Sequence, residues 1–245
     1  MNDETPSTLR RVLGAIAALT YLAVLFRTAW ISDDAAITLR TVLNVTHGFG
    51  LTFNIAERVQ TYTHPLWLGV LTAGYFVAGN VFVVAFAATM ICSVVAFWIA
   101  VTRAASPIQA VLAAVVLLFS QAFVDFSTSG LENPLANVLL AAFVILFLND
   151  GLDRRRWLTG LWGLAALLYL TRPDLVLLVL PMLVLASWRV RRPLTIAAAV
   201  LAGTLPAIAW TIFSIVYYGF PFPNTAYAKL AMGIDPGELR TQGLL

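Results

Sequence analysis

The sequence predicts an all-α protein, a polytopic transmembrane helical bundle of about seven spans with interfacial helices in its first outer loop. Two observations lead to this fold class. Of the 245 residues, 60% are hydrophobic and only 11% are charged, with a mean hydropathy of +0.87. A soluble domain carries about 25% charged residues, so this chain lacks the polar groups to cover a water-facing surface. In addition, its apolar residues gather in long runs that short polar segments separate.

Seven apolar runs reach or approach the length of about 20 residues that a membrane-spanning helix needs. They cover residues 12–30, 81–102, 108–123, 135–148, 158–170, 175–188 and 194–217. The first outer loop, residues 31–64, contains a short amphipathic stretch at 35–46, which we expect to be helical. Another apolar run, 65–79, is either an eighth span or a helix lying in the membrane interface.

The distribution of positive charge decides between these two topologies. If 65–79 does not cross, most of the 15 Lys and Arg residues fall on the cytoplasmic side, including the clusters at 10–11, 154–156 and 189–192. If it crosses, the cluster at 154–156 faces outward and the positive-inside bias is lost. We therefore predict seven spans and an interfacial helix. The polar groups outside the arginine clusters then lie on the extracytoplasmic side of a cell membrane.

Several function classes are excluded at this stage. The net charge of +3 comes from loop clusters, whereas a nucleic-acid-binding protein gathers Lys and Arg on one solvated face, so no nucleic-acid partner is expected. The single Cys92 cannot form an internal disulfide or a cysteine-based zinc site. Phosphate-binding and dinucleotide-binding glycine motifs are missing from the sequence, which argues against a nucleotide-sugar donor.

The first candidate for chemistry is the pair Asp33-Asp34, which directly follows the first span. Two adjacent carboxylates at a membrane surface repel one another, and a carboxylate in such a setting can accept a proton from an attacking hydroxyl. The alternative is that the pair only ends a helix with polar groups beyond the bilayer. The sequence leaves both interpretations open.

Other polar and aromatic residues lie on the same side. Tyr62 and His64 either contact a substrate or make structural hydrogen bonds. Glu132 at the bilayer edge needs a partner or water. Arg172 either binds a lipid phosphate or pairs with Asp174. The remaining candidate binding residues are Arg58, Asn224, Tyr227 and Lys229.

The order of these motifs resembles a known family. The segments are ISDDA (31–35), GFGLTFN (48–54), ERV (57–59), YTHPLW (62–67), SGLENPL (129–135), RPD (172–174) and YGFPFPNTAYAK (218–229). Together they are similar to GT-C glycosyltransferases of bacterial envelopes. Within these, they most resemble the terminal β-(1→2) arabinofuranosyltransferases of actinobacterial cell walls.

The resemblance implies a polyprenyl-phosphate sugar, such as decaprenyl-phosphoryl-arabinofuranose, as donor and arabinan or another envelope glycan as acceptor. In that family, acidic residues of the first outer loop are catalytic, and the resemblance implies the same role for Asp33 and Asp34. One carboxylate would be the base, and the other would orient the acceptor or help to hold a divalent cation; no other cofactor is implied. Family members are longer, so residues 1–245 are expected to be the N-terminal transmembrane module of a truncated chain, without further spans and a soluble extracytoplasmic domain.

Two alternatives remain. A GT-C enzyme that uses another lipid-linked sugar would share the Asp-Asp, Gly-Leu-Glu and Arg-Pro-Asp elements. A transporter or flippase of lipid-linked glycan is the main alternative from another class, but such proteins place charged groups near the membrane midplane. Here the predicted spans are almost free of ionisable residues near their centres.

Overall fold

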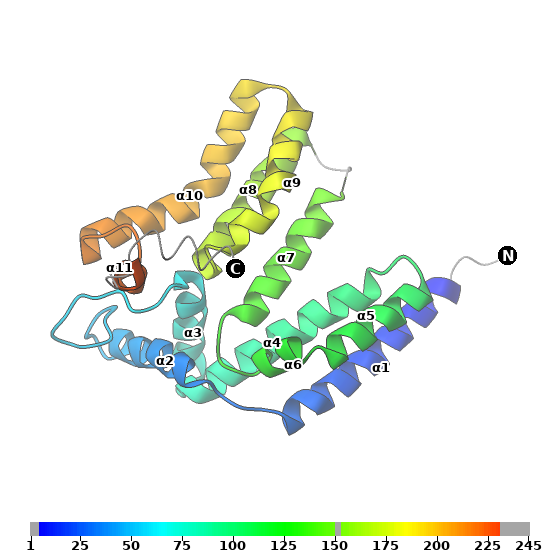
Figure 1. The fold of residues 1–245 in the computed structure, drawn as a ribbon, viewed down its shortest axis with the longest axis horizontal. Coiled ribbons are helices and arrows are strands. Elements are labelled where there is room, and N and C mark those ends of the chain that lie inside the picture. Colours follow the sequence, from blue (N-terminus) through cyan, green and yellow to red (C-terminus); the bar gives the residue numbers. More distant parts are fainter. Residues whose placement is uncertain (1–4, 150–152, 231–245) are drawn as a thin grey trace, which may run out of the picture.

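The protein is a helical bundle in the computed structural model, which describes residues 5–149 and 153–230 and contains no strand over those ranges (Figure 1). The helices are α1 (Thr5–Arg27), α2 (Asp33–Thr46), α3 (Pro65–Ala78), α4 (Val81–Thr102), α5 (Pro107–Phe119), α6 (Gln121–Phe126), α7 (Asn133–Phe147), α8 (Arg154–Thr171), α9 (Leu175–Val190), α10 (Pro193–Tyr218) and α11 (Asn224–Leu230). The prediction of an all-α fold is confirmed for this part of the chain.

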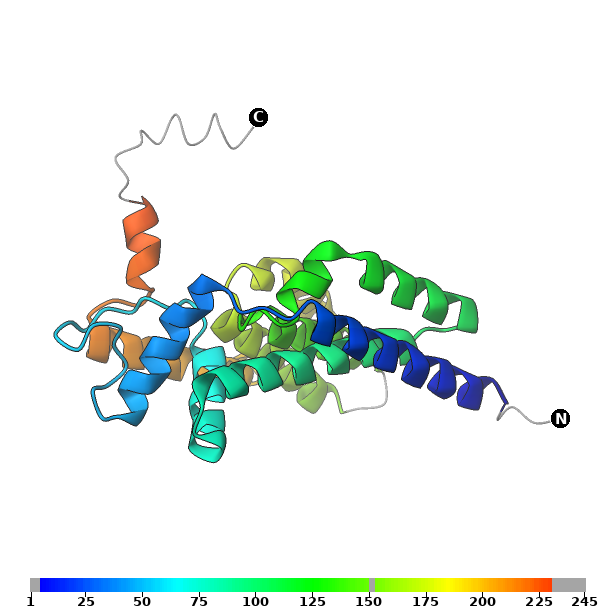
Figure 2. The same ribbon diagram turned by 90° about the horizontal axis from the view of Figure 1, so that it is seen from below.

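The long helices pack into one bundle with its connecting loops at two ends. Helix α4 packs against α1, α5 and α7, and α8 packs against α7, α9 and α10. Helices α2, α3 and α11 and the loop of residues 47–64 gather at one end, far from the described start of α1 (Figures 1 and 2). We call this end, together with the turns at 127–132 and 172–174, the loop end. It brings together most of the polar residues singled out in the sequence.

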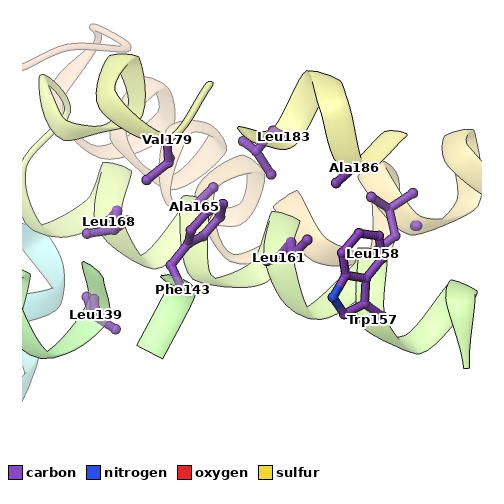
Figure 3. Packing of buried hydrophobic residues seen from close by; sticks show 11 residues of the cluster. Leu139, Phe143, Trp157, Leu158, Leu161, Ala165, Leu168, Val179, Leu183 and Ala186 are labelled. Carbon is purple, nitrogen blue, oxygen red and sulfur yellow. The ribbon is translucent and has the colours of Figure 1, made fainter. Parts of the chain in front are cut away.

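The largest buried cluster lies where α7, α8, α9 and α10 meet. Phe143 of α7, Leu161 of α8 and Leu183 of α9 are among its members, all of them buried (Figure 3). Helix α10 approaches α8 closely at Gly203, where an added Cβ would lie 2.6 Å from the Cβ of Trp162. Pro206, one turn further along, lies inside α10, and Figure 1 shows that α10 bends along its length, as an interior proline causes. This bend brings the end of α10 over the loop end.

Two of the described helices, α4 and α10, are long and apolar enough to cross a membrane. The other apolar helices are shorter: α5, for example, has 13 residues. At a rise of about 1.5 Å per residue it spans about 20 Å, less than the roughly 30 Å of a bilayer core. The seven-span topology and its sidedness therefore stay predictions.

Most predicted elements agree with the structure, with corrections at their ends. The run 108–123 is not one helix, because Ser120 ends α5 and its side chain caps α6 by accepting from Phe123 N–H. The predicted helix 35–46 begins two residues earlier, at Asp33. The first run, 12–30, ends as a helix at Arg27. Helix α3 lies across the direction of α4 (Figure 2); that it lies in a membrane interface stays a prediction.

Candidate active site

The acidic pair forms the first turn of α2, and its two carboxylates have different surroundings. Asp33 Oδ1 accepts a hydrogen bond from Asp34 N–H at 3.0 Å, and the N-cap Ser32 Oγ accepts from the same N–H at 3.3 Å. Asp33 therefore helps to cap the helix, where negative charge is favourable. The Asp34 carboxylate has no hydrogen-bond or ion-pair partner within the described residues. Both residues are exposed, so the pair is not a desolvated one.

Asp34 lies at the edge of the face of α2 that packs against the bundle. Residues four apart share one side of a helix, so Asp34 lies one turn before Thr38, which is 1% exposed. Asp33 instead precedes Ile37 and Arg40, and Arg40 is exposed with its guanidinium over the Phe53 ring. Of the two carboxylates, Asp34 is the one on the side of the buried polar residues.

Those buried polar residues form a line that begins at Thr38. Thr38 Oγ1 lies 2.7 Å from His64 Nε2, and His64 Nδ1 lies 3.3 Å from Glu132 Oε2. His64 is the residue before α3, and Glu132 is the residue before α7. Burial lowers the pKa of the His64 imidazole and outweighs the opposing effect of Glu132, while Arg172 lowers it further. His64 is therefore neutral at neutral pH. The partner that the sequence required for Glu132 is present.

Arg172 is the cation at the end of this line. It donates to Asn133 Oδ1 and, at 3.3 Å, to Asp174 Oδ2, while its Nε lies 4.0 Å from Glu132 Oε1. The pairing with Asp174 that the sequence suggested is thus confirmed. The Arg172 side chain nevertheless remains 38% exposed. It can pair with Asp174 and still reach an anion at the surface.

A second network joins the 47–64 loop to the end of α10 and to α11. Gln60 is fully buried; its N–H donates to Asn224 Oδ1 at 3.0 Å, and its carbonyl accepts from Asn224 N–H at 3.1 Å. The Ser214 hydroxyl of α10 donates to Gln60 Oε1. Asn224, predicted to bind substrate, therefore has its side-chain oxygen engaged inside the protein.

Tyr62 belongs to the same network. Its hydroxyl lies 2.8 Å from that of Tyr218, and the Tyr218 hydroxyl also donates to the Leu51 carbonyl. Tyr62 is 2% exposed, and this burial raises the pKa of its phenol. The sequence left a substrate contact and a structural hydrogen bond open for Tyr62, and the structure shows the hydrogen bond.

The remaining predicted residues lie at the surface of the loop end. Arg58 is exposed, with its guanidinium 5.1 Å from the centre of the Tyr217 ring. Tyr227 of α11 is 37% exposed and contacts Phe220. The backbone of Lys229 lies in α11, but its side chain lies outside the described part of the structure. No group of three or more His, Cys, Asp or Glu residues that could hold a metal ion occurs in the described ranges.

An apolar groove adjoins this polar line. Its volume is about 570 Å³, and it lies between α3, α8 and the bent part of α10. Leu170 and Pro65 line it, and these residues are close neighbours in sequence of Arg172 and His64. The backbone at one end of the groove thus runs directly into the segments that carry Arg172 and His64. Its walls are formed by Pro65, Leu66, Gly69, Val70, Ala73, Leu170, Pro206, Ala209, Trp210 and Phe213.

Sequence reasoning missed Thr38 and did not single out Gln60 or Tyr218. The position of Thr38, one turn after Asp34 on the amphipathic helix, is the signal that would have indicated it. Gln60 bonds to Asn224 and Tyr218 to Tyr62, which lie 164 and 156 residues away along the chain. Only the folded structure shows these contacts.

The chain is similar to two curated proteins, each named terminal β-(1→2)-arabinofuranosyltransferase. The protein from Mycobacterium tuberculosis is 34% identical over 242 residues, which cover 88% of this chain and 38% of that protein. The protein from Corynebacterium glutamicum is 32% identical over 243 residues, 82% of this chain and 33% of that protein. The chain thus spans about a third to two fifths of the length of these relatives, and the resemblance drawn from its motifs is confirmed. No protein-family model matches the chain, and no solved structure matches it.

Proposed function

We propose that this chain is the membrane module of a glycosyltransferase that moves arabinofuranose from a polyprenyl-phosphate donor to a cell-envelope glycan on the extracytoplasmic side. The names of the two relatives support arabinofuranosyl transfer. The observation that carries the proposal is the apolar groove, which is lined by Leu170, two residues before Arg172. A donor of this class has a long apolar chain, a phosphate and a sugar, in that order. The groove, the Arg172 guanidinium and the acidic start of α2 offer a matching environment for each part.

The chemistry needs few protein groups. The acceptor hydroxyl attacks C1 of the donor sugar, the bond from C1 to the phosphate oxygen breaks, and polyprenyl phosphate leaves with that electron pair. Asp34 takes the proton of the attacking hydroxyl, because its carboxylate is exposed and has no partner among residues 5–149 and 153–230. Arg172 stabilises the negative charge of the departing phosphate, and Arg58 is a further cation at the loop end. Lys229, whose backbone lies in α11, stays a predicted phosphate contact. Asp33, Asp174 and Tyr227 are left to contact the sugar or the acceptor.

The described helices favour a transferase over a transporter. The two helices long enough to cross a membrane, α4 and α10, contain no Asp, Glu, Lys, Arg or His. Transporters place such groups in their spans, where they bind the substrate or coupling ion. In this chain the ionisable candidates lie at the loop end instead.

A direct assay tests the proposal. Membranes that contain the chain would receive polyprenyl-phosphoryl-arabinofuranose labelled in the sugar, together with an arabinan oligosaccharide as acceptor. We expect label in the glycan as a β-(1→2)-linked residue, and strongly reduced labelling when Asp34 is replaced by Asn. Val216→Leu is the control, because Val216 is 80% exposed on α10 and away from the groove. Transfer from a different lipid-linked sugar would overturn the choice of arabinofuranose. Movement of intact donor across the membrane without transfer would indicate a flippase.

A further inference from the structure

Thr38, His64 and Glu132 form a hydroxyl–imidazole–carboxylate line that three separate segments build. The distances are 2.7 Å from Thr38 Oγ1 to His64 Nε2 and 3.3 Å from His64 Nδ1 to Glu132 Oε2. Enzymes that use a hydroxyl as nucleophile have this order of groups, in which the imidazole takes the proton and the carboxylate orients the imidazole. The same geometry also serves simply to hold two elements together. Burial distinguishes the two roles.

A nucleophile must be reached by its substrate, and Thr38 is 1% exposed. His64 and Glu132 are also buried, at 8% and 9% exposure. Nothing as large as a sugar can approach the Thr38 hydroxyl without moving α2 away from the bundle. The line is therefore not a nucleophilic triad, and the imidazole is likewise too enclosed to contact a sugar directly.

The surroundings show what the line holds in place. The turn at 129–132 contacts α2 and α3: Ser32 N–H donates to the Ser129 carbonyl at 2.9 Å, and the Trp67 indole N–H donates to the Gly130 carbonyl at 3.0 Å. Gly130 has φ +81°, and an added Cβ there would lie 2.9 Å from the Cβ of Ala35. The start of α2 is thus fixed to this turn. The contact between Thr38 and His64 fixes α2 a second time, one turn after Asp34.

We propose that His64 is a positioning residue, which acts through Thr38 to fix the orientation of α2 and so the position of the Asp34 carboxylate at its start. This inference rests on the proposed function and assigns His64 and Glu132 a role other than substrate binding. The Glu132 carboxylate, 3.3 Å from Nδ1, favours the proton on that nitrogen through its negative charge, and the Thr63 hydroxyl lies 3.4 Å from the same nitrogen. His64 Nε2 is then the acceptor for the Thr38 hydroxyl.

Paired threonine substitutions test this assignment in the full chain. Thr38→Val removes the hydroxyl and keeps a branched side chain of similar size, whereas Thr38→Ser keeps the hydroxyl. Thr41→Val is the matched control: Thr41 is also a fully buried threonine of α2, but its hydroxyl donates to the Ile37 carbonyl within the helix. We expect Thr38→Val to lower kcat, by up to about 100-fold for a displacement near 1 Å, with little change in the KM for donor. Thr38→Ser and Thr41→Val should retain most of the wild-type kcat.

A second measurement does not depend on activity. Hydrogen exchange of the α2 amides should become faster in Thr38→Val and in His64→Gln, but not in Thr41→Val, while exchange in α10 stays unchanged. Unchanged α2 exchange with wild-type kcat in Thr38→Val would overturn the proposal. A rise in donor KM in His64→Gln that Thr38→Val does not share would also overturn it, because it would make His64 a substrate contact. A wild-type chain that transfers no sugar would instead contradict the proposed function and leave the exchange comparison to decide the role of His64.

Discussion

Gln60 and Asn224 hold one another by two reciprocal hydrogen bonds across 164 residues of sequence. The Gln60 N–H donates to Asn224 Oδ1, and the Asn224 N–H donates to the Gln60 carbonyl. This pair fastens the loop before α3 to the start of α11. It thereby closes the loop end over the bent half of α10.

The first prediction concerns this fastening. Asn224→Ala leaves the buried Gln60 N–H without its acceptor, which costs about 1–3 kcal/mol. Asn224→Asp keeps an oxygen at the same position and should be milder. Thermal unfolding of the purified chain in detergent measures both, and we expect a clear fall in Tm for the alanine variant. Equal Tm values for wild type and Asn224→Ala would mean that the pair does not stabilise the loop end.

The acidic pair should separate into two roles. Asp34→Asn removes the proposed base while nearly preserving shape, so we expect transfer to fall by about 10²–10⁴-fold. Asp33→Asn should cost less, since asparagine retains the oxygen that accepts from the Asp34 N–H. Initial rates at saturating donor, with membrane expression checked for each variant, provide the comparison. Wild-type rates in both variants would mean that the pair only caps α2.

The groove makes a prediction at Gly69, a residue of α3 that lines it. A Cβ added at Gly69 would meet no atom within 4 Å, so Gly69→Ala should fold and work normally. Gly69→Leu fills part of the groove and should raise the KM for the lipid-linked donor without lowering Tm. Val77→Leu is the matched control, because Val77 is 90% exposed on the same helix and outside the groove. Unchanged donor kinetics in Gly69→Leu would exclude the groove as the site of the isoprenoid chain.

Topology can be checked with reporter fusions. A reporter after Gly79 should be found outside the cytoplasm or at the outer interface, whereas reporters after Arg103 and Arg156 should be cytoplasmic, as the positive-inside rule requires. A cytoplasmic signal at Gly79 would contradict the seven-span prediction and the extracytoplasmic location of the proposed site.

Stability should decrease below neutral pH through His64. Burial lowers the pKa of His64 in the folded chain, with Glu132 and Arg172 as the neighbouring charges, so the unfolded chain binds the proton more readily. The contribution of neutral His64 to the stability of the folded chain is complete above the pKa of about 6.5 that histidine has in the unfolded chain. This contribution is lost as the pH falls from there toward the lower pKa in the folded chain. We expect Tm to drop in that range, and the drop should be smaller in His64→Gln. The same pH dependence in both proteins would show that other groups are responsible.

Local patterns in the sequence predicted most helices and several contacts. Helix α3 follows the apolar run that begins at Pro65, and α2 follows the amphipathic stretch after Asp34. The ion pair between Arg172 and Asp174 joins residues two positions apart. Such features depend on side chains within one or two turns, so hydropathy and spacing are sufficient to predict them. The break at Ser120 was missed because serine competes with the helix backbone through its own side chain, and an apolar run does not show that competition.

The sequence by itself determined that this is an apolar helical chain whose polar motifs, in their particular order, resemble those of arabinofuranosyltransferases. Only the tertiary structure decided which of those polar residues meet. Thr38 and His64 are 26 residues apart, and Tyr62 and Tyr218 are 156 apart. Their contacts depend on how α2 packs against the bundle and on where the bend at Pro206 directs the end of α10. The apolar groove has the same origin, since its walls come from three helices, α3, α8 and α10, that no local pattern places side by side.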